Sequence, residues 1–229
     1  MSFLDDLKQQ AQARQAQLRG DHAVIEHNVA LVEAACAVVW RYLDDLGRQL
    51  DVLQPASPQR YAIDPRAVVE GLRYTAFGAD LRRKRVERGP LSAPEWVDYI
   101  VLTARLVSGQ SFELTKDFPP EIERLEARLA QAGIRCLGEP ERDPVSSRFL
   151  CNRYRFTADL VAGVRVLPLH EQGRLQFNVQ NLDGLATVKA TFAAHQMTTE
   201  RLDELAKWWM GQPHRFLDGA LEVQRTEPW

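Results

Sequence analysis

The chain has 229 residues, of which 45% are hydrophobic and 26% are charged, and its formal net charge is −2. This composition is typical of a globular protein that is long enough to bury a substantial core. A charge so close to neutral excludes a strong overall positive field, so the bulk charge would not drive the whole molecule onto nucleic acid or an anionic membrane.

The start of the chain and its cysteines indicate a cellular compartment. The sequence MSFLDDLK has acidic residues where a secretory signal has basic ones, and we expect no apolar run long enough to cross a bilayer. The three cysteines, Cys36, Cys136 and Cys151, are an odd number and show no CxxC spacing. We therefore predict a cytoplasmic protein with free thiols and no membrane partner.

The first 54 residues are predicted to be helical. A first helix is expected over 2–19. Gly20 suits the position after a helix and Asp21 suits the N-cap of the next one, so the chain is predicted to turn here. A second helix would run from about residue 22 to residue 53, where the sequence QPASP ends it. We therefore expect an N-terminal helical hairpin or coiled coil.

The second of these helices carries the most regular pattern in the sequence, a seam of apolar residues separated alternately by four and three positions. A helix that buries one narrow seam against a partner helix needs this spacing. We predict that the seam contacts another subunit, with a dimer as the default because two-fold assemblies are the commonest. The alternative is that the seam docks on its own chain. Its members are Ile25, Val29, Val32, Cys36, Val39, Leu43, Leu46, Leu50 and Leu53.

After residue 58 the apolar pattern changes to period two, which is typical of strands in an antiparallel sheet. Turn residues predict hairpins at 108–110, 171–173 and 183–184. Strands are expected at 60–64, 72–81, 96–107, 111–115, 134–137, 148–157, 161–169, 174–181 and 186–194.

Two further helices are expected among the strands. One opens with the prolines at 119–120 and ends at Gly133, and the other is capped by a threonine at 198 or 199 and ends at Gly211. Each follows a turn and a strand, so the two stretches share one plan. This similarity suggests an internal duplication, although strand–helix units of this kind are also common without one.

The predicted fold class is α+β. A helical hairpin or coiled-coil segment over 1–54 precedes an antiparallel sheet domain with two covering helices over 59–229. Within that domain the duplication would give halves at 59–133 and 134–211, followed by a C-terminal tail.

No motif in the sequence identifies a reaction. GxGxxG, GxxxxGK[ST], HExxH and GxSxG are all absent, which weakens nucleotide-binding and common hydrolase functions. His22 and Glu26 share a helix face but have no third ligand nearby, so we predict neither a metal site nor a cofactor. His170 and Glu171 are interpreted as an exposed pair at a hairpin tip. No catalytic residue is assigned.

One basic cluster could contact a polyanion. Arg82, Arg83, Lys84, Arg85 and Arg88 lie at the end of a predicted strand, and such density is what phosphate binding requires. The alternative is that the cluster binds no ligand and lies on an edge strand, where its charges prevent the edge from pairing with the sheet of another molecule.

The adjacent tryptophans of the last predicted helix cannot both face the same core. Trp209 fits the apolar face, so Trp208 is a candidate for protein contact, or else it packs under the C-terminal tail.

These features favour a non-enzymatic cytoplasmic protein that self-associates and presents its sheet domain to a protein partner, as an adaptor, a chaperone-like factor or an assembly component. One alternative is nucleic-acid binding through the cluster at 82–88. Another is a small-ligand or enzymatic pocket between the sheet and its helices.

Overall fold

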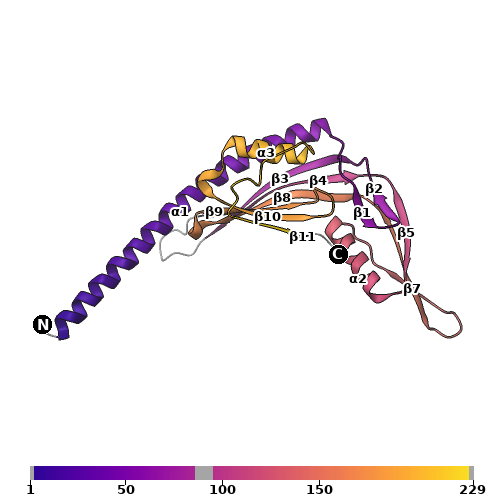
Figure 1. The fold of residues 1–229 in the computed structure, drawn as a ribbon, viewed down its shortest axis with the longest axis horizontal. Helices are drawn as coiled ribbons and strands as arrows, with labels where there is room; N and C mark the ends of the chain where they lie inside the picture. Colours follow the sequence, from indigo (N-terminus) through magenta and orange to yellow (C-terminus); the bar gives the residue numbers. More distant parts are fainter. Residues whose placement is uncertain (1–2, 86–94, 227–229) are drawn as a thin grey trace.

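A single long helix opens the molecule. The computed structural model describes residues 3–85 and 95–226, and for most of residues 3–21 it describes the helical backbone alone. Helix α1 (Phe3–Leu53) has 51 residues, which corresponds to about 75 Å at ~1.5 Å per residue. Figure 1 shows its N-terminal half extending beyond the rest of the molecule.

The predicted helical hairpin is therefore wrong, because the chain does not turn at Gly20. A glycine inside a helix costs only about 1 kcal/mol relative to alanine, which good helix formers on both sides can offset. Gly47 lies in the same helix where it crosses the sheet. A Cβ atom there would come within 2.8 Å of a methyl group of Leu102, so this glycine permits a close approach of helix and sheet.

The main sheet has six antiparallel strands in the order β11-β10-β9-β8-β4-β3. The predicted α+β class with antiparallel sheet is confirmed, and the hairpins at 171–173 and 183–184 join β8 to β9 and β9 to β10. The six strands are β3 (Arg73–Arg85), β4 (Glu95–Val107), β8 (Leu160–Leu169), β9 (Arg174–Gln180), β10 (Thr187–Ala193) and β11 (Glu222–Thr226).

Two smaller sheets complete the strand arrangement. Strands β1 (Tyr61–Asp64) and β2 (Ala67–Val69) pair with each other. Strand β7 (Phe149–Thr157) lies between β5 (Ser111–Lys116) and β6 (Glu139–Arg142).

The sequence predictions fail at three places in the strand region. The turn at 108–110 does not make a hairpin, because β4 and β5 belong to different sheets and the chain changes sheets there. The stretch 134–137 is irregular, and the strand begins at residue 139 instead. Strands β2 and β11 were not expected.

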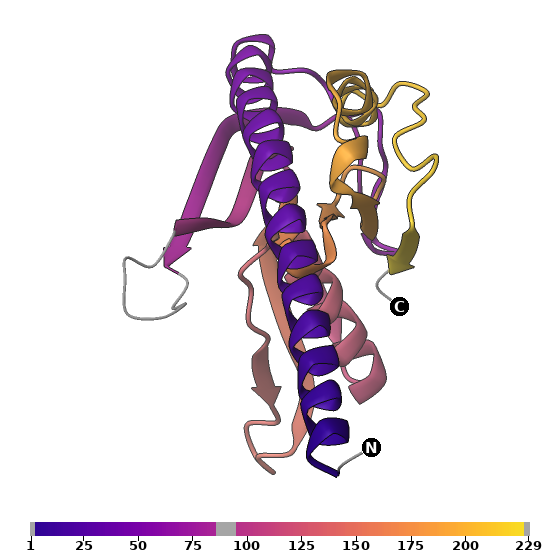
Figure 2. The ribbon, with the colours of Figure 1, turned by 90° about the vertical axis from the view of Figure 1, so that its left-hand side faces the viewer.

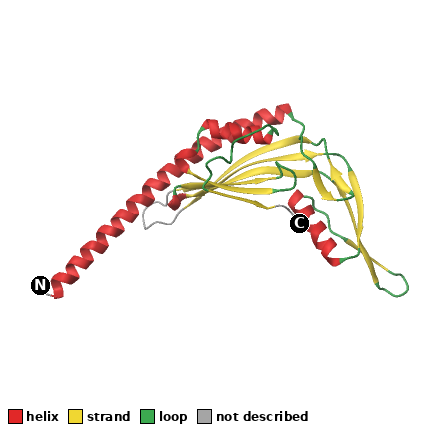
Figure 3. Ribbon diagram, in the orientation of Figure 1, coloured by secondary structure: helices red, strands yellow, loops and turns green. Residues whose placement is uncertain are grey.

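The helices cover the main sheet unequally. The second half of α1 and helix α3 (Thr199–Trp209) lie together on one face, whereas helix α2 (Pro119–Ala132) lies on the other side at one end (Figures 1 and 3). The two 3-10 turns are η1 (His170–Gln172) and η2 (Ala194–Gln196). The buried apolar residues form one core that includes α1 as well as the strands.

The predicted duplication is not confirmed. Strands from the first half of the chain (β3 and β4) and from the second half (β8 to β11) share one sheet, and β5 from the first half pairs with β7 from the second. The two halves are thus interleaved.

Candidate interaction surfaces

The apolar seam of α1 is largely part of the core of its own chain. Side chains from Val32 to Leu50 pack against the sheet, where Val32, Cys36, Val39, Leu43 and Leu50 are buried and Leu46 is half-buried. These six residues are therefore already covered within one chain. Only the two ends of the seam differ: Ile25 and Val29 are half-buried, and Leu53 is 66% exposed.

Glu33 joins α1 to the sheet at the point where the helix leaves the body of the molecule. One carboxylate oxygen, Oε1, accepts a hydrogen bond from the Val97 amide at 2.9 Å and lies 2.8 Å from Nε2 of His170. The other, Oε2, lies 3.4 Å from Nη1 of Arg83. His170 also stacks on Trp96 at a centroid separation of 4.7 Å. We name this group the Glu33 junction.

The position of His170 corrects the sequence interpretation, since this side chain is only 6% exposed rather than at a free hairpin tip. The turn η1 folds against α1, and the Asn28 side-chain amide donates to the Glu171 carbonyl at 2.8 Å. A Cβ atom at Gly173 would approach Asn28 Oδ1 to 2.9 Å, so the turn sits tightly on the helix. Figure 2 looks along this side of the molecule, with α1 in front.

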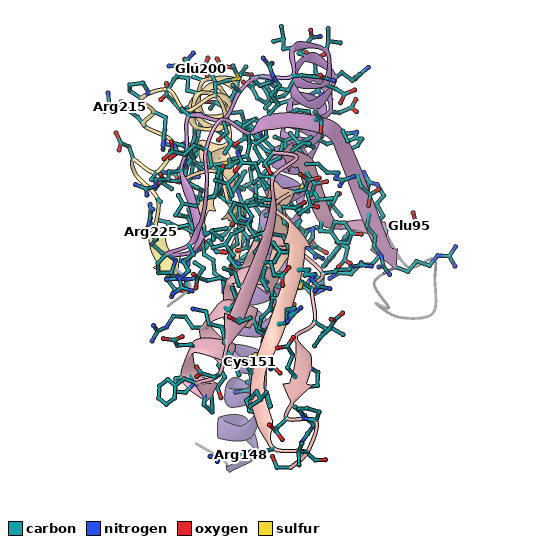
Figure 4. The ribbon with its side chains drawn as sticks, turned by 90° about the vertical axis from the view of Figure 1, so that its right-hand side faces the viewer. Glu95, Arg148, Cys151, Glu200, Arg215 and Arg225 are labelled. Atoms are coloured by element: carbon teal, nitrogen blue, oxygen red, sulfur yellow. The ribbon has the colours of Figure 1, made fainter. Side chains whose placement is uncertain are left out.

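The Cys36 thiol lies beneath the Glu33 junction and is unreactive for a physical reason. Burial raises the pKa of the Cys36 thiol to about 12, the Glu33 carboxylate adds to this effect, and Arg83 opposes it. Cys136 and Cys151 are only partly buried, and Figure 4 shows Cys151 on a strand that extends away from the main sheet.

Thiol labelling should therefore separate the three cysteines. The thiolate is the reacting species, so at about pH 8 the native protein should take up two labels and leave Cys36 untouched. Cys151 should react more slowly than Cys136, because desolvation and Glu141 raise the pKa of the Cys151 thiol. Denatured protein should take up three. Mass spectrometry of both states measures this, and modification of Cys36 in the native state would contradict the packing of α1 on the sheet.

The predicted basic cluster lies on an edge strand, and its charges are matched by acidic partners. Arg82 and Lys84 share Asp98, at 3.9 and 3.0 Å. Arg83 pairs with Glu33 as above, and Arg85 lies 3.5 Å from Glu95 at the start of β4, which is labelled in Figure 4. Arg88 lies outside the described residues. The four described cations are thus less available to a polyanion than the sequence suggests.

Trp208 is not an exposed contact residue. Its side chain is 5% exposed, stacks on His214 at 4.7 Å between ring centroids and lies near Phe216. The residues after α3 fold back over this ring, so Trp208 packs under the C-terminal segment while Trp209 packs in the core. Of the two roles considered for Trp208, packing under the C-terminal segment is the one that its burial and ring contacts fit.

One face of the main sheet is open, and sequence reasoning missed it. Core residues such as Leu102 and Val164 alternate along β4 and β8 with Val101 and Arg165, which therefore point away from α1 and α3. Figure 1 shows the sheet arching over this side, with α2 below one end. We call this surface the open face and define it by Arg82, Tyr99, Val101, Arg165, Gln176, Asn178 and Lys189.

Polar side chains from neighbouring strands lie side by side on the open face. Arg165, Asn178 and Lys189 are register partners across β8, β9 and β10. The Arg165 guanidinium lies 4.3 Å from the centroid of the Tyr99 ring. No single segment of the sequence contains this arrangement, because each strand contributes one or two residues to it.

The remaining predicted sites give no evidence of chemistry. His22 and Glu26 form an exposed pair at 3.2 Å, and the described residues contain no group of three potential metal ligands. A hollow of about 1140 Å³ lies beside α2 and the residues that follow it. One acidic side chain on its wall, Glu126, already accepts a hydrogen bond from Tyr154 at 2.8 Å.

One expectation about membranes needs correction. By length and composition alone, the stretch His22–Leu53 of α1 is apolar enough to cross a bilayer. In the folded molecule its seam from Val32 to Leu50 packs against the sheet, while only 22% of its most apolar window is buried.

No family model, curated protein or solved structure matches the chain.

Proposed function

We propose that this protein is a non-enzymatic cytoplasmic assembly protein that pairs with a second copy of itself. The pairing would use the projecting part of α1, by which we mean the residues of the helix before Val32. The observation that carries this proposal is the extent of the helix. The buried seam begins at Val32, yet α1 starts at Phe3. More than half of the helix therefore lies before the first seam residue that its own core covers.

A helix that stands alone in water lacks the packing that is the main source of helix stability in proteins. Most helices in proteins gain their stability from packing an apolar face against a neighbour. Val24, which is next to the seam position Ile25, is 60% exposed. A second helix packed along this stretch would cover such a surface.

The sequence of the projecting part retains half of the heptad pattern. Leu4, Ala11, Leu18 and Ile25 recur at every seventh position in line with Val32. The alternate seam positions there hold polar residues, Lys8, Gln15 and His22. Polar residues at seam positions fix register and partner number at a cost in stability, so we expect a reversible dimer of defined register.

Sedimentation velocity over a range of protein concentrations tests the proposal. The intact protein should show a species of twice the 26.1 kDa of one chain. The double variant Leu18→Lys/Ile25→Lys should remain monomeric, because two charges at seam positions would have to be desolvated in the dimer. Thermal unfolding should be close to that of the wild type, since both sites precede the buried seam and Ile25 is only half-buried on its own chain.

Val52→Lys is the matched control. It places one lysine at the other end of the same helix, at a valine that is 83% exposed, and it should leave the dimer intact. An intact protein that is monomeric at all concentrations would overturn the proposal, and so would a dimer that the double variant leaves unchanged.

A further inference from the structure

We propose that the open face of the main sheet binds single-stranded nucleic acid. This surface lies on the opposite side of the sheet from the second half of α1, and the inference does not depend on self-association. The sequence suggests the basic run at 82–88 as the nucleic-acid site, but the described cations of that run are matched by carboxylates. The open face, which is assembled from five neighbouring strands, is the better candidate.

The centre of the open face is an arginine placed over an aromatic ring, which we call the platform. Arg165 lies over the Tyr99 ring at 4.3 Å, and the Tyr99 hydroxyl donates to Asp80 at 3.4 Å, which holds the ring in place. Arg165 is exposed, so the outer side of its guanidinium plane is accessible. Unpaired bases stack on aromatic rings and on arginine planes in this way, and the stack tolerates any base.

Amide side chains lie beside the platform on the next strand. Gln176 donates from Nε2 to Asn178 Oδ1 at 2.9 Å, so the two amides hold each other in one orientation. The remaining donors and acceptors of this pair are those that hydrogen bond to base edges. Asn178 is the register partner of Arg165 on one side and of Lys189 on the other.

Arg165 and Lys189 carry the positive charge of the open face. Within residues 3–85 and 95–226, neither Arg165 nor Lys189 forms an ion pair with a carboxylate, in contrast to the cations of β3. On the far side of the platform Arg82 lies opposite Tyr99, where it is paired with Asp98 at 3.9 Å and adds no free charge. From β3 to β10 the face spans about 19 Å at ~4.8 Å between strands, which is enough for a few nucleotides.

The chemistry of the open face favours nucleic acid over a protein partner. Protein interfaces bury aromatic and apolar anchors at their centre and are depleted of charge there. The open face instead has arginine, lysine and amides at its centre and one ring, Tyr99, which is already covered by Arg165. A single strand suits it better than a duplex because only unpaired bases can stack on a platform.

Fluorescence anisotropy with labelled oligo-U and oligo-dT of about 15 nucleotides tests the inference, using the intact protein at about 50 and 200 mM salt. We expect binding that weakens with salt. Each phosphate contact on a single strand contributes about 0.7 to the slope of log K against log salt, so Arg165→Gln/Lys189→Gln should reduce that slope by about 1.4. Tyr99→Leu should weaken binding several-fold with little change in slope.

Arg41→Gln is the matched control, since it removes an exposed arginine from α1 on the other side of the sheet, and it should bind like the wild type. Circular dichroism confirms that each variant is folded. The inference fails if the intact protein does not bind at about 50 mM salt, if a duplex of the same length binds as tightly, or if Arg165→Gln/Lys189→Gln binds with the affinity and salt slope of the wild type.

Discussion

Replacing Leu43 with alanine is expected to lower the free energy of unfolding by about 2–5 kcal/mol. Leu43 lies midway along the seam of α1 and is fully buried in the core that the helix forms with the sheet. Truncation would remove apolar surface from the core and leave a cavity between two rigid elements, neither of which can close it easily.

Leu53→Ala is the control for this prediction, because it makes the same chemical change at the last position of the same seam. Leu53 is 66% exposed, and its truncation should change the free energy of unfolding by no more than about 0.5 kcal/mol. Urea unfolding followed by circular dichroism measures both variants. Equal effects, or a Leu43→Ala variant as stable as the wild type, would show that the seam is not part of the core.

The seam illustrates what a sequence can and cannot say about a helix. Alternate spacings of four and three predict the helix and its buried edge correctly. The same narrow stripe serves a helix that lies on a partner helix and one that crosses the middle of a sheet. The sequence could therefore identify Val39 and Leu43 as buried without identifying what buries them.

Local turn signals were reliable only where the next element stayed in the same sheet. Gly173 and Gly184 lie in hairpins as predicted, with positive φ angles of 66° and 65°. Gly109 also has a positive φ, yet the chain at this corner moves to another sheet. Gly20 lies within a continuous helix because its neighbours favour helix. The conformation of a glycine thus depends on partners that are distant in the sequence.

The candidate surfaces also depend on residues that are distant from one another in the sequence. A run of basic residues is visible in a sequence, but the acidic residues that neutralise it, such as Glu33 and Asp98, lie far away or on the next strand. The open face, in contrast, cannot be seen in the sequence at all. Arg165, Asn178 and Lys189 are isolated in the sequence and become neighbours only through strand pairing.

Replacing Glu33 with alanine is expected to destabilise the protein by about 2–4 kcal/mol, although the residue is not in the apolar core. One carboxylate serves the Val97 amide, the His170 ring and the Arg83 guanidinium. Its removal would leave a backbone N–H and a buried ring nitrogen without their partner. Because His170 is carried by η1 and Val97 by β4, the loss would also loosen the contact between α1 and the body.

Two further variants show whether the charge or the shape of Glu33 matters. Glu33→Gln retains an oxygen that can accept from the Val97 amide, so it should lower the free energy of unfolding less than Glu33→Ala does. Glu26→Ala removes an exposed glutamate from the same helix and should lower the free energy of unfolding by no more than about 0.5 kcal/mol. Hydrogen exchange adds a local readout, since Glu33→Ala should speed exchange of the amides of α1 near residue 33 more than those near residue 43. Uniform exchange along the helix would mean that the Glu33 junction does not hold α1 at the point where it leaves the body, and that the apolar seam alone keeps the helix on the sheet.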